Sequence, residues 1–309
     1  MTQLSVHLPG LHLKNPIMPS SGTFGFGERH MGKFDYNILG AIIIKSTTSQ
    51  ARVGNPEPTY YQLDTCILNA IGLKNPGVDV IVNEKLPALK EFDTPIIASV
   101  AGNTTAEFVE VTKKLCQSPY VKALELNVSC PNVAEGGLTF GSNPEAVRSM
   151  TEAVKKVATL PVYVKLTPNV TDIVAIAQAA EQGGADGISM INTFSSMVID
   201  LKTRKPILSN KTGGLSGSGI KPIAIRMVYQ VSRAVSIPII GMGGVSTVDD
   251  VLEMIMAGAS AVAIGTAQYN NPLVCKELIE ALPVRMKELG IESIEGLIKE
   301  VKEGRLNEN

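Results

Sequence analysis

The sequence predicts an α/β protein in which the 309-residue chain forms a single (β/α)8 barrel. Three observations support this prediction: eight short runs rich in Ile and Val, amphipathic segments between them, and polar residues directly after each run. Runs that are apolar throughout are typical of parallel strands buried on both faces. A doubly wound open sheet is the alternative, because the number of strands alone does not prove that the sheet closes.

Two short alternating segments precede the first run. Apolar residues alternate from Leu4 to Leu8, Pro9 and Gly10 form a turn, and the alternation resumes at Leu11. This pattern predicts an N-terminal β-hairpin within residues 1–15. We expect the hairpin to cover the bottom of the barrel.

Eight apolar runs are the predicted strands. They span residues 16–18, 41–44, 95–100, 123–128, 161–166, 187–191, 238–241 and 261–264. The odd-numbered runs begin with Pro16, Pro95, Pro161 and Pro238, whereas the even-numbered runs begin beside small residues. Proline is tolerated at the first residue of a strand, where its missing N–H is needed least. The alternation suggests a repeated quarter-barrel unit, with chance and ordinary strand-entry preference as the alternative.

Capping residues mark helices between the strands. Thr104 and Glu107 have the spacing of a capping box, and Asn143 caps a second helix. A third helix is expected to begin at Ser246. A last amphipathic helix is expected over residues 294–301.

Three segments are expected to cover the mouth of the barrel. They span residues 46–77, 129–143 and 193–220, each directly after a predicted strand. Connections of this length are usually functional. No linker-like break interrupts the pattern, so residues 1–309 are predicted to form one domain.

Composition excludes several classes of function. The 28 basic and 29 acidic residues give a net charge of −1, which supports neither a nucleic-acid partner nor an anionic membrane. No apolar stretch is long enough to span a bilayer, and no secretory signal is recognisable. Scattered cysteines are typical of the cytoplasm. The histidines and cysteines show no metal-site spacing, and they are His7, His12, His30, Cys66, Cys116, Cys130 and Cys275.

Glycine-rich turns after the last two strands predict a phosphate site. Gly243 and Gly244 follow the seventh strand, and Gly265 and Thr266 follow the eighth. These loops commonly bind phosphate in this fold through bare backbone N–H groups. Tight turns without a ligand are the simpler alternative. Gly217, in a Gly/Ser-rich stretch, is expected to close over the same ligand.

Lys165 ends the fifth strand, in the middle of the predicted mouth. Such a lysine can form a Schiff base, as in a phosphosugar lyase, or stand as a cation beside a flavin that becomes anionic on reduction. A non-catalytic phosphate-binding barrel is a third possibility. The residues alone leave all three open.

Three motifs resemble the dihydroorotate dehydrogenase family. They are residues 127–132 (Asn-Val-Ser-Cys-Pro-Asn), 68–73 (Leu-Asn-Ala-Ile-Gly-Leu) and 191–193 (Ile-Asn-Thr). The turns at Gly243-Gly244 and Gly265-Thr266 complete the pattern. The resemblance extends over essentially the whole chain. The cysteine at position 130 of the first motif resembles class 1 enzymes of the family, and residues 69–77 resemble the NAD-linked class 1B.

The resemblance implies FMN-dependent oxidation of (S)-dihydroorotate to orotate in de novo pyrimidine (UMP) biosynthesis. In the family's reaction Cys130 would be the base that takes the C5 proton, and FMN N5 would take the C6 hydride. Lys45 would lie between flavin and substrate. Another FMN barrel reductase, similar to dihydropyrimidine dehydrogenase, is the alternative, although that enzyme's further cofactor domains are not recognisable here.

The resemblance also implies two sets of ligand residues. Those expected to bind FMN are Ser21, Lys45, Ser46, Ser99, Asn127, Lys165, Ile191, Gly217, Gly243, Gly244, Gly265 and Thr266. Those expected to bind dihydroorotate or orotate are Lys45, Asn69, Ala70, Ile71, Gly72, Leu73, Asn127, Asn132, Asn192 and Thr193. Amide side chains offer both donors and acceptors, which suits a ring of alternating N–H and C=O groups.

Class 1B resemblance implies a protein partner. The chain has no Gly-x-Gly-x-x-Gly after a predicted strand and no four clustered cysteines. FAD and a [2Fe–2S] cluster are therefore expected on a separate iron–sulfur flavoprotein subunit that passes electrons to NAD+. The family expectation is a cytoplasmic heterotetramer built on a homodimer of this chain.

Overall fold

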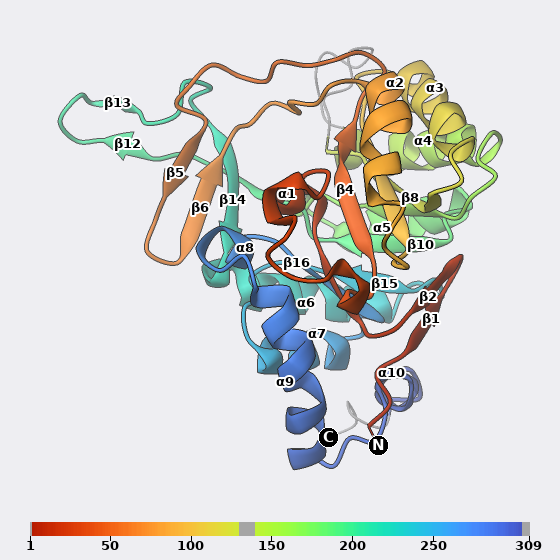
Figure 1. Cartoon of the computed structure of the whole chain (residues 1–309). Coiled ribbons are helices and arrows are strands. Elements are labelled where there is room, and N and C mark those ends of the chain that lie inside the picture. Colours follow the sequence, from red (N-terminus) through yellow and green to blue (C-terminus); the bar gives the residue numbers. More distant parts are fainter. Residues whose placement is uncertain (1, 130–139, 305–309) are drawn as a thin grey trace.

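Eight parallel strands form the centre of the computed structural model, which describes residues 2–129 and 140–304 (Figure 1). Their order around the sheet is β3-β16-β15-β10-β9-β8-β7-β4. The strands are β3 (Ile17–Pro19), β4 (Ile42–Thr47), β7 (Ile96–Val100), β8 (Val121–Asn127), β9 (Val162–Lys165), β10 (Gly187–Met190), β15 (Ile239–Gly241) and β16 (Ala261–Ile264). All eight predicted strands are confirmed, with small shifts at their ends.

The sheet closes between its first and last strands, β3 and β4. The backbone N–H of Gly40, just before β4, donates to the carbonyl of Ile17 in β3 at 2.9 Å. A Cβ at Gly40 would collide with the carbonyl of Asn15, so a glycine lets the two strands approach. The predicted barrel is therefore confirmed over the open-sheet alternative.

Prolines recur at alternate strands around the barrel. Each lies directly before its strand, and its carbonyl accepts a hydrogen bond from the neighbouring even-numbered strand. The pairs are Val262 to Pro16 (2.8 Å), Ile42 to Pro95 (2.8 Å), Leu124 to Pro161 (2.9 Å) and Ile188 to Pro238 (2.9 Å). The same hydrogen bond thus repeats four times, as the quarter-barrel interpretation requires.

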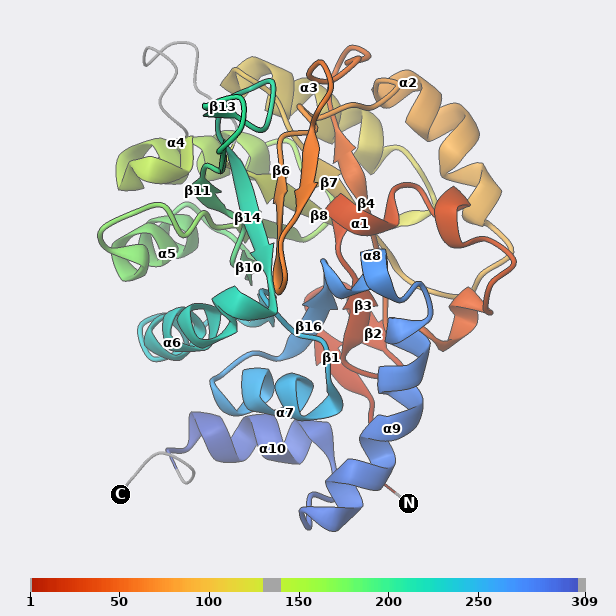
Figure 2. The same cartoon turned by 90° about the vertical axis from the view of Figure 1, so that its left-hand side faces the viewer.

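Helices surround the strands (Figure 2). The α-helices are α1 (Ser21–Phe24), α2 (Val78–Val80), α3 (Thr105–Cys116), α4 (Pro144–Lys155), α5 (Ile173–Gln182), α6 (Lys221–Ser232), α7 (Val248–Met256), α8 (Ala267–Asn270), α9 (Val274–Glu288) and α10 (Ile294–Lys302). Shorter 3₁₀ or π turns are η1 (Glu28–His30), η2 (Tyr36–Ile38), η3 (Ile81–Lys85), η4 (Pro87–Leu89), η6 (Phe140–Ser142) and η7 (Ser218–Ile220).

Two of the predicted helix caps need correction. The Thr104 side chain does accept from the N–H of Glu107, but the Glu107 carboxylate accepts from Asn103 rather than from the cap residue. The helix expected to begin at Ser246 is capped one residue later, by Thr247, which forms a complete capping box with Asp250. The Asn143 cap is confirmed.

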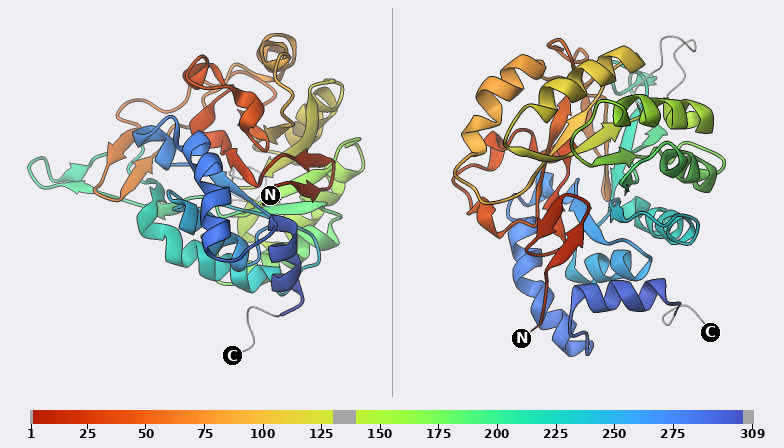
Figure 3. Two further views of the ribbon diagram at one scale, coloured as in Figure 1. Left: turned by 60° about the horizontal axis from the view of Figure 1, so that its bottom comes forward. Right: turned by 90° about the vertical axis from the view of Figure 1, so that its right-hand side faces the viewer.

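The predicted hairpin closes the bottom of the barrel. It consists of β1 (Val6–Leu8) and β2 (Leu11–Leu13), and Figure 3 shows it in dark red near the N-terminus. Tyr163 of β9 donates its phenol hydrogen to the carbonyl of Pro9 in the hairpin turn, at 2.9 Å. The hairpin is therefore tied directly to a barrel strand.

The two longest connections contribute the strands of a second sheet. Four antiparallel strands lie in the order β11-β14-β6-β5 in front of the barrel strands (Figure 2). They are β5 (Tyr60–Gln62), β6 (Cys66–Asn69), β11 (Phe194–Ser196) and β14 (Gly213–Gly217). A small hairpin of β12 (Ile199–Asp200) and β13 (Lys205–Pro206) projects from the body of the molecule (Figure 1). We name the four-stranded unit the cover sheet.

His30 is a buried histidine with no hydrogen-bond partner on either ring nitrogen in the described structure. Its ring stacks on Phe24, with 5.2 Å between ring centroids. Burial and the positive charges of Lys33 and Arg29 lower the pKa of His30. The unfolded chain therefore takes up a proton near pH 6.5 that the folded chain does not.

We expect stability to fall as the pH drops below about 6.5 towards the lower folded-state pKa of His30. His30→Phe should reduce the difference in unfolding free energy between pH 7 and pH 5, because no histidine then has to be protonated there on unfolding. Urea unfolding at both pH values measures this difference. His12→Phe, at an exposed position in the hairpin, is the control. An unchanged pH dependence in His30→Phe would contradict the assignment.

Candidate active site

A cavity of about 680 Å³ lies where the barrel strands end, beneath the cover sheet. Of the expected cofactor residues it is lined by Ser21, Lys45, Ser46, Asn127, Lys165, Ile191, Gly217, Gly243, Gly244, Gly265 and Thr266. Of the expected substrate residues it is lined by Lys45, Asn69, Ala70, Ile71, Gly72, Leu73, Asn127, Asn192 and Thr193. Cys130 and Asn132 lie outside the described residues, as does most of the expected loop 129–143.

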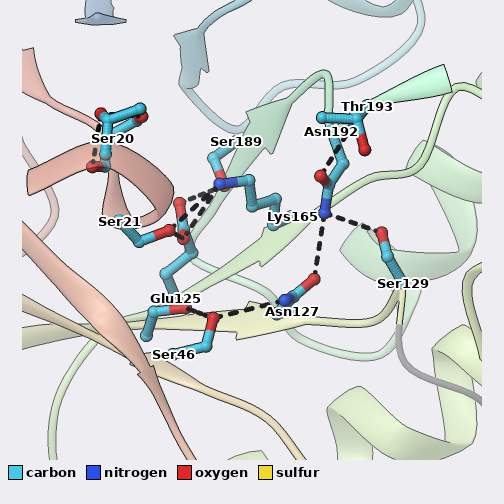
Figure 4. A network of polar contacts seen from close by, with 12 residues as sticks. Ser20, Ser21, Ser46, Glu125, Asn127, Ser129, Lys165, Ser189, Asn192 and Thr193 are labelled. Carbon is cyan, nitrogen blue, oxygen red and sulfur yellow. Dashed lines mark hydrogen bonds and ion pairs between the residues drawn. The ribbon is translucent and has the colours of Figure 1, made fainter. Parts of the chain in front are cut away.

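Lys165, the last residue of β9, brings a buried ammonium to the floor of this cavity (Figure 4). Its Nζ lies 3.5 Å from Oε1 of Glu125 and 3.4 Å from the hydroxyl of Ser21. The lysine is thus held between β8 and the start of α1. A ligand in the cavity meets a fixed positive charge there.

Sequence reasoning missed Glu125. This side chain also accepts a hydrogen bond from Ser189 of β10 on Oε2, at 2.9 Å. A signal was present, because Glu125 stands two residues before Asn127 in an otherwise apolar stretch. Alternation along a strand places both on the same face, towards the barrel interior.

Lys45 and Ser46 are neighbours in β4, yet both line the cavity. The pairing of β4 with β7 shifts register between Ile44 and Thr47, and such an irregularity re-aims side chains near active sites. Burial, helped by the charges of Arg29 and Lys74, lowers the pKa of Lys45. An anionic ligand is the partner that this cation lacks among the described residues.

Ser99 is the one described residue of the expected set that does not line the cavity. It is fully buried in β7, and its hydroxyl lies 2.9 Å from that of Ser46. Ser46 in turn accepts a hydrogen bond from Asn127 at 3.3 Å. Ser99 therefore supports the cavity wall through Ser46.

Amide and hydroxyl groups from two segments, the end of β8 and the residues after β10, meet on one side of the cavity (Figure 4). Asn192 donates to Oδ1 of Asn127 at 3.1 Å and to the hydroxyl of Ser129 at 2.9 Å. Its own Oδ1 accepts from the N–H of Thr193 at 2.8 Å. Such a cluster can exchange these internal hydrogen bonds for bonds to a planar polar ring.

The segment after β6 offers backbone donors. Gly72 and Leu73 both have left-handed backbone conformations, with φ of 75° and 55°. In the part of the chain that the structure describes, the N–H groups of Ile71, Gly72 and Leu73 donate to no protein acceptor. Free N–H groups in such a turn form a concave site for a carboxylate.

The glycine turns form a cradle at the opposite end of the cavity. Gly217, Gly243 and Gly244 have positive φ, and a Cβ at Gly244 would meet the carbonyl of Gly217 at 2.9 Å. The N–H groups of Gly243, Gly244 and Thr266 have no acceptor among residues 2–129 and 140–304. This arrangement fits a phosphate group bound by backbone N–H groups.

Asp250, which sequence reasoning also missed, holds the cradle in place. Its carboxylate accepts from the N–H groups of Ser246 and Thr247 and from the ammonium of Lys221 at 2.6 Å. Although burial acts in the other direction, these hydrogen bonds keep the pKa of Asp250 below its usual range. The turn after β15 is thereby fixed to the start of α6.

A second cavity, of about 530 Å³, shares Lys45 with the first. The charged residues among its lining are mostly basic, with Glu28 as the acidic side chain. The basic residues are Arg29, Lys45, Arg52, Lys74 and Lys85. The excess of positive charge attracts anions towards the neighbouring cavity.

The described residues contain no group of three or more His, Cys, Asp or Glu side chains arranged to hold a metal ion. Within residues 2–129 and 140–304, no helix is both long and apolar enough to cross a membrane.

Fold and site together define a (β/α)8 barrel enzyme with a phosphate cradle and a buried lysine in one cavity. The sequence model of the dihydroorotate dehydrogenase family matches residues 3–286, and the chain belongs to this family. The membership expected from the motifs is therefore confirmed. It favours the oxidoreductase interpretation of Lys165 over the Schiff-base lyase.

Close relatives cover nearly the whole chain. A protein of Enterococcus faecalis is 61% identical over 305 residues, which is 98% of each chain. One of Anoxybacillus flavithermus is 58% identical over 95% of this chain and 94% of its own. One of Listeria welshimeri is 57% identical over 97% of this chain and 99% of its own. All three are named dihydroorotate dehydrogenase B (NAD(+)), catalytic subunit.

Gly244→Ala should weaken the binding of FMN to the cradle. The added Cβ would meet backbone atoms of Lys221 and Gly217 at 2.8 and 2.9 Å, so we expect the affinity for FMN to fall by roughly tenfold or more. Quenching of flavin fluorescence measures the dissociation constant.

Gly290→Ala is the matched control for Gly244→Ala. Gly290 also has positive φ, 71°, but a Cβ there meets nothing within 4 Å. Equal losses of FMN affinity in the two variants would show that backbone strain, not the cradle, is responsible.

Proposed function

We propose that this chain oxidises (S)-dihydroorotate to orotate with bound FMN, in the de novo synthesis of pyrimidines. The observation that carries the proposal is family membership over nearly the full chain. The cavity supports it, because a phosphate cradle, a buried cation and an amide cluster lie in one space.

The cavity offers groups that suit both the phosphate and the ring of FMN. The free N–H groups at Gly243, Gly244 and Thr266 suit the phosphate, and the ammonium of Lys165 suits the N1–O2 edge of the ring. When bound, FMN supplies the acceptor for the two electrons. We propose residues 1–309 as one FMN-binding domain, with segments 46–77, 129–143 and 193–220 around the active site.

The amide cluster is proposed to bind the substrate ring. Asn69, Asn127 and Asn192, together with Asn132 outside the described residues, offer donors and acceptors for its N–H and C=O groups. The N–H groups from Ile71 to Leu73 would hold the carboxylate. Lys45 would add its charge between flavin and substrate.

Cys130 is proposed to remove the C5 proton. A thiolate is the active form, and a free thiol has a pKa of about 8.5. The remaining cysteines are poorly suited to act as this base, because Cys66 is buried, Cys116 ends α3, and burial raises the pKa of Cys275 to about 12. The proposal for Cys130 rests on its place in the 127–132 motif.

A partner subunit is proposed to complete the electron path. The names of the relatives describe a catalytic subunit and NAD(+), which implies a separate subunit for electron transfer. We propose that this subunit carries FAD and a [2Fe–2S] cluster, and that two copies of each chain assemble in the cytoplasm. Exposed apolar residues on the β12–β13 hairpin, including Leu201 at 89% exposure, support contacts with another chain.

The proposal predicts a yellow protein with one FMN per chain. Adding dihydroorotate without oxygen should bleach the flavin absorbance, because the electrons pass to FMN. The visible spectrum before and after addition measures this change. A folded, colourless protein that takes up no FMN would refute the proposal.

Cys130→Ala should slow flavin bleaching by dihydroorotate by about 10²–10⁴-fold, the usual contribution of a positioned base. Stopped-flow absorbance measures the rate. Cys116→Ala, at the half-buried end of α3, should leave it unchanged. A loss below tenfold in Cys130→Ala would reject its role. In Cys130→Ser the residual rate should increase towards high pH, since a hydroxyl ionises less readily than a thiol.

A further inference from the structure

An ion pair is sealed beneath the proposed flavin site. The side chains of Glu125 and Lys165 are 1% and 8% exposed. Lys165 lines the cavity, whereas Glu125 does not. The lysine therefore stands between the carboxylate and any ligand, and a bound flavin would meet the pair through Lys165.

The carboxylate of Glu125 has a fixed orientation. Oε2 accepts from Ser189 at 2.9 Å, while Oε1 faces both Lys165 at 3.5 Å and Ser21 at 3.4 Å (Figure 4). These contacts come from three different elements of the barrel. The geometry of the carboxylate is consequently set by the barrel itself and not by a ligand.

Such a pair needs a reason beyond stability. Buried ion pairs are often no more stabilising than apolar residues of similar volume, whereas removing one partner is costly. The neighbouring inward positions of the same strands, Ala123 and Tyr163, show that apolar and aromatic residues fit this interior. A charge pair at the cavity floor is better explained by what it presents to a ligand.

We propose that Glu125 is a positioning residue, which holds the ammonium of Lys165 against the flavin and offsets its charge. The proposal rests on the proposed function for the flavin. The pair has a net charge of zero, so the site favours the anionic reduced flavin less than Lys165 alone would. Glu125 thus sets the balance between oxidised and reduced cofactor without touching it.

Four proteins that differ in the net charge of the Glu125–Lys165 pair test the proposal: wild type, Glu125→Gln, Lys165→Met and the double variant. The net charge of the pair is 0, +1, −1 and 0 in that order. The measured quantity is the ratio of dissociation constants for oxidised and reduced FMN, obtained by anaerobic fluorescence titration.

We expect this ratio to rise roughly tenfold in Glu125→Gln and to fall roughly tenfold in Lys165→Met. The double variant should lie between the two. Glu181→Gln, a carboxylate on the outside of the barrel that binds Ser236, should leave the ratio unchanged. A ratio in Glu125→Gln that equals or falls below the wild-type value overturns the proposal, because a merely structural carboxylate would not raise it.

A second measurement does not need the flavin. Each single variant should lower the free energy of unfolding of the FMN-free protein, and the double variant should be more stable than either, because no unpaired charge remains buried. Additive losses would overturn the pairing. If the wild type binds no FMN, the proposed function fails, and this coupling still decides whether Glu125 holds Lys165.

Discussion

Closure of eight parallel strands is the constraint on which the rest of the molecule depends. Because the strands run in one direction, all of their carboxyl ends reach the same rim, and residues distant in sequence meet there. The closure depends on close approach at Gly40, where β4 meets β3. The proline carbonyls add a regular set of hydrogen bonds at the opposite ends of the strands. Hydrogen bonds thus stabilise the rim at the amino ends of the strands, while the rim at their carboxyl ends provides the residues of the candidate active site.

The barrel interior changes character along its axis. Near the hairpin it is filled by residues such as Tyr163, whereas towards the mouth four consecutive strands contribute Ser99, Glu125, Lys165 and Ser189. Charges in this buried layer act in a medium of low dielectric, where they are stronger than in water. A ligand at the mouth therefore lies on a polar floor whose groups are already paired and oriented.

The strands, the hairpin and the glycine cradle could be predicted because each has a strong local signal: continuous apolar runs, a Pro-Gly turn and paired glycines. The cover sheet could not, because three of its four strands lack a continuous apolar run and Asn69 finds its partner Gly214 145 residues away. Glu125 was missed because one acidic residue in an apolar run carries little weight. Ser246 and Thr247 are both good caps, and each is followed three residues later by an aspartate, so the sequence pattern does not decide between them.

The pairing of β6 with β14 joins the two halves of the active site. Asn69, which lines the cavity, lies opposite Gly214, and the same ladder ends at Gly217 in the glycine cradle. An insertion in either strand would shift the register and turn alternate side chains to the other face. The two segments therefore form one structural unit. An engineered exchange of one of these two strands between relatives should therefore include the other strand as well.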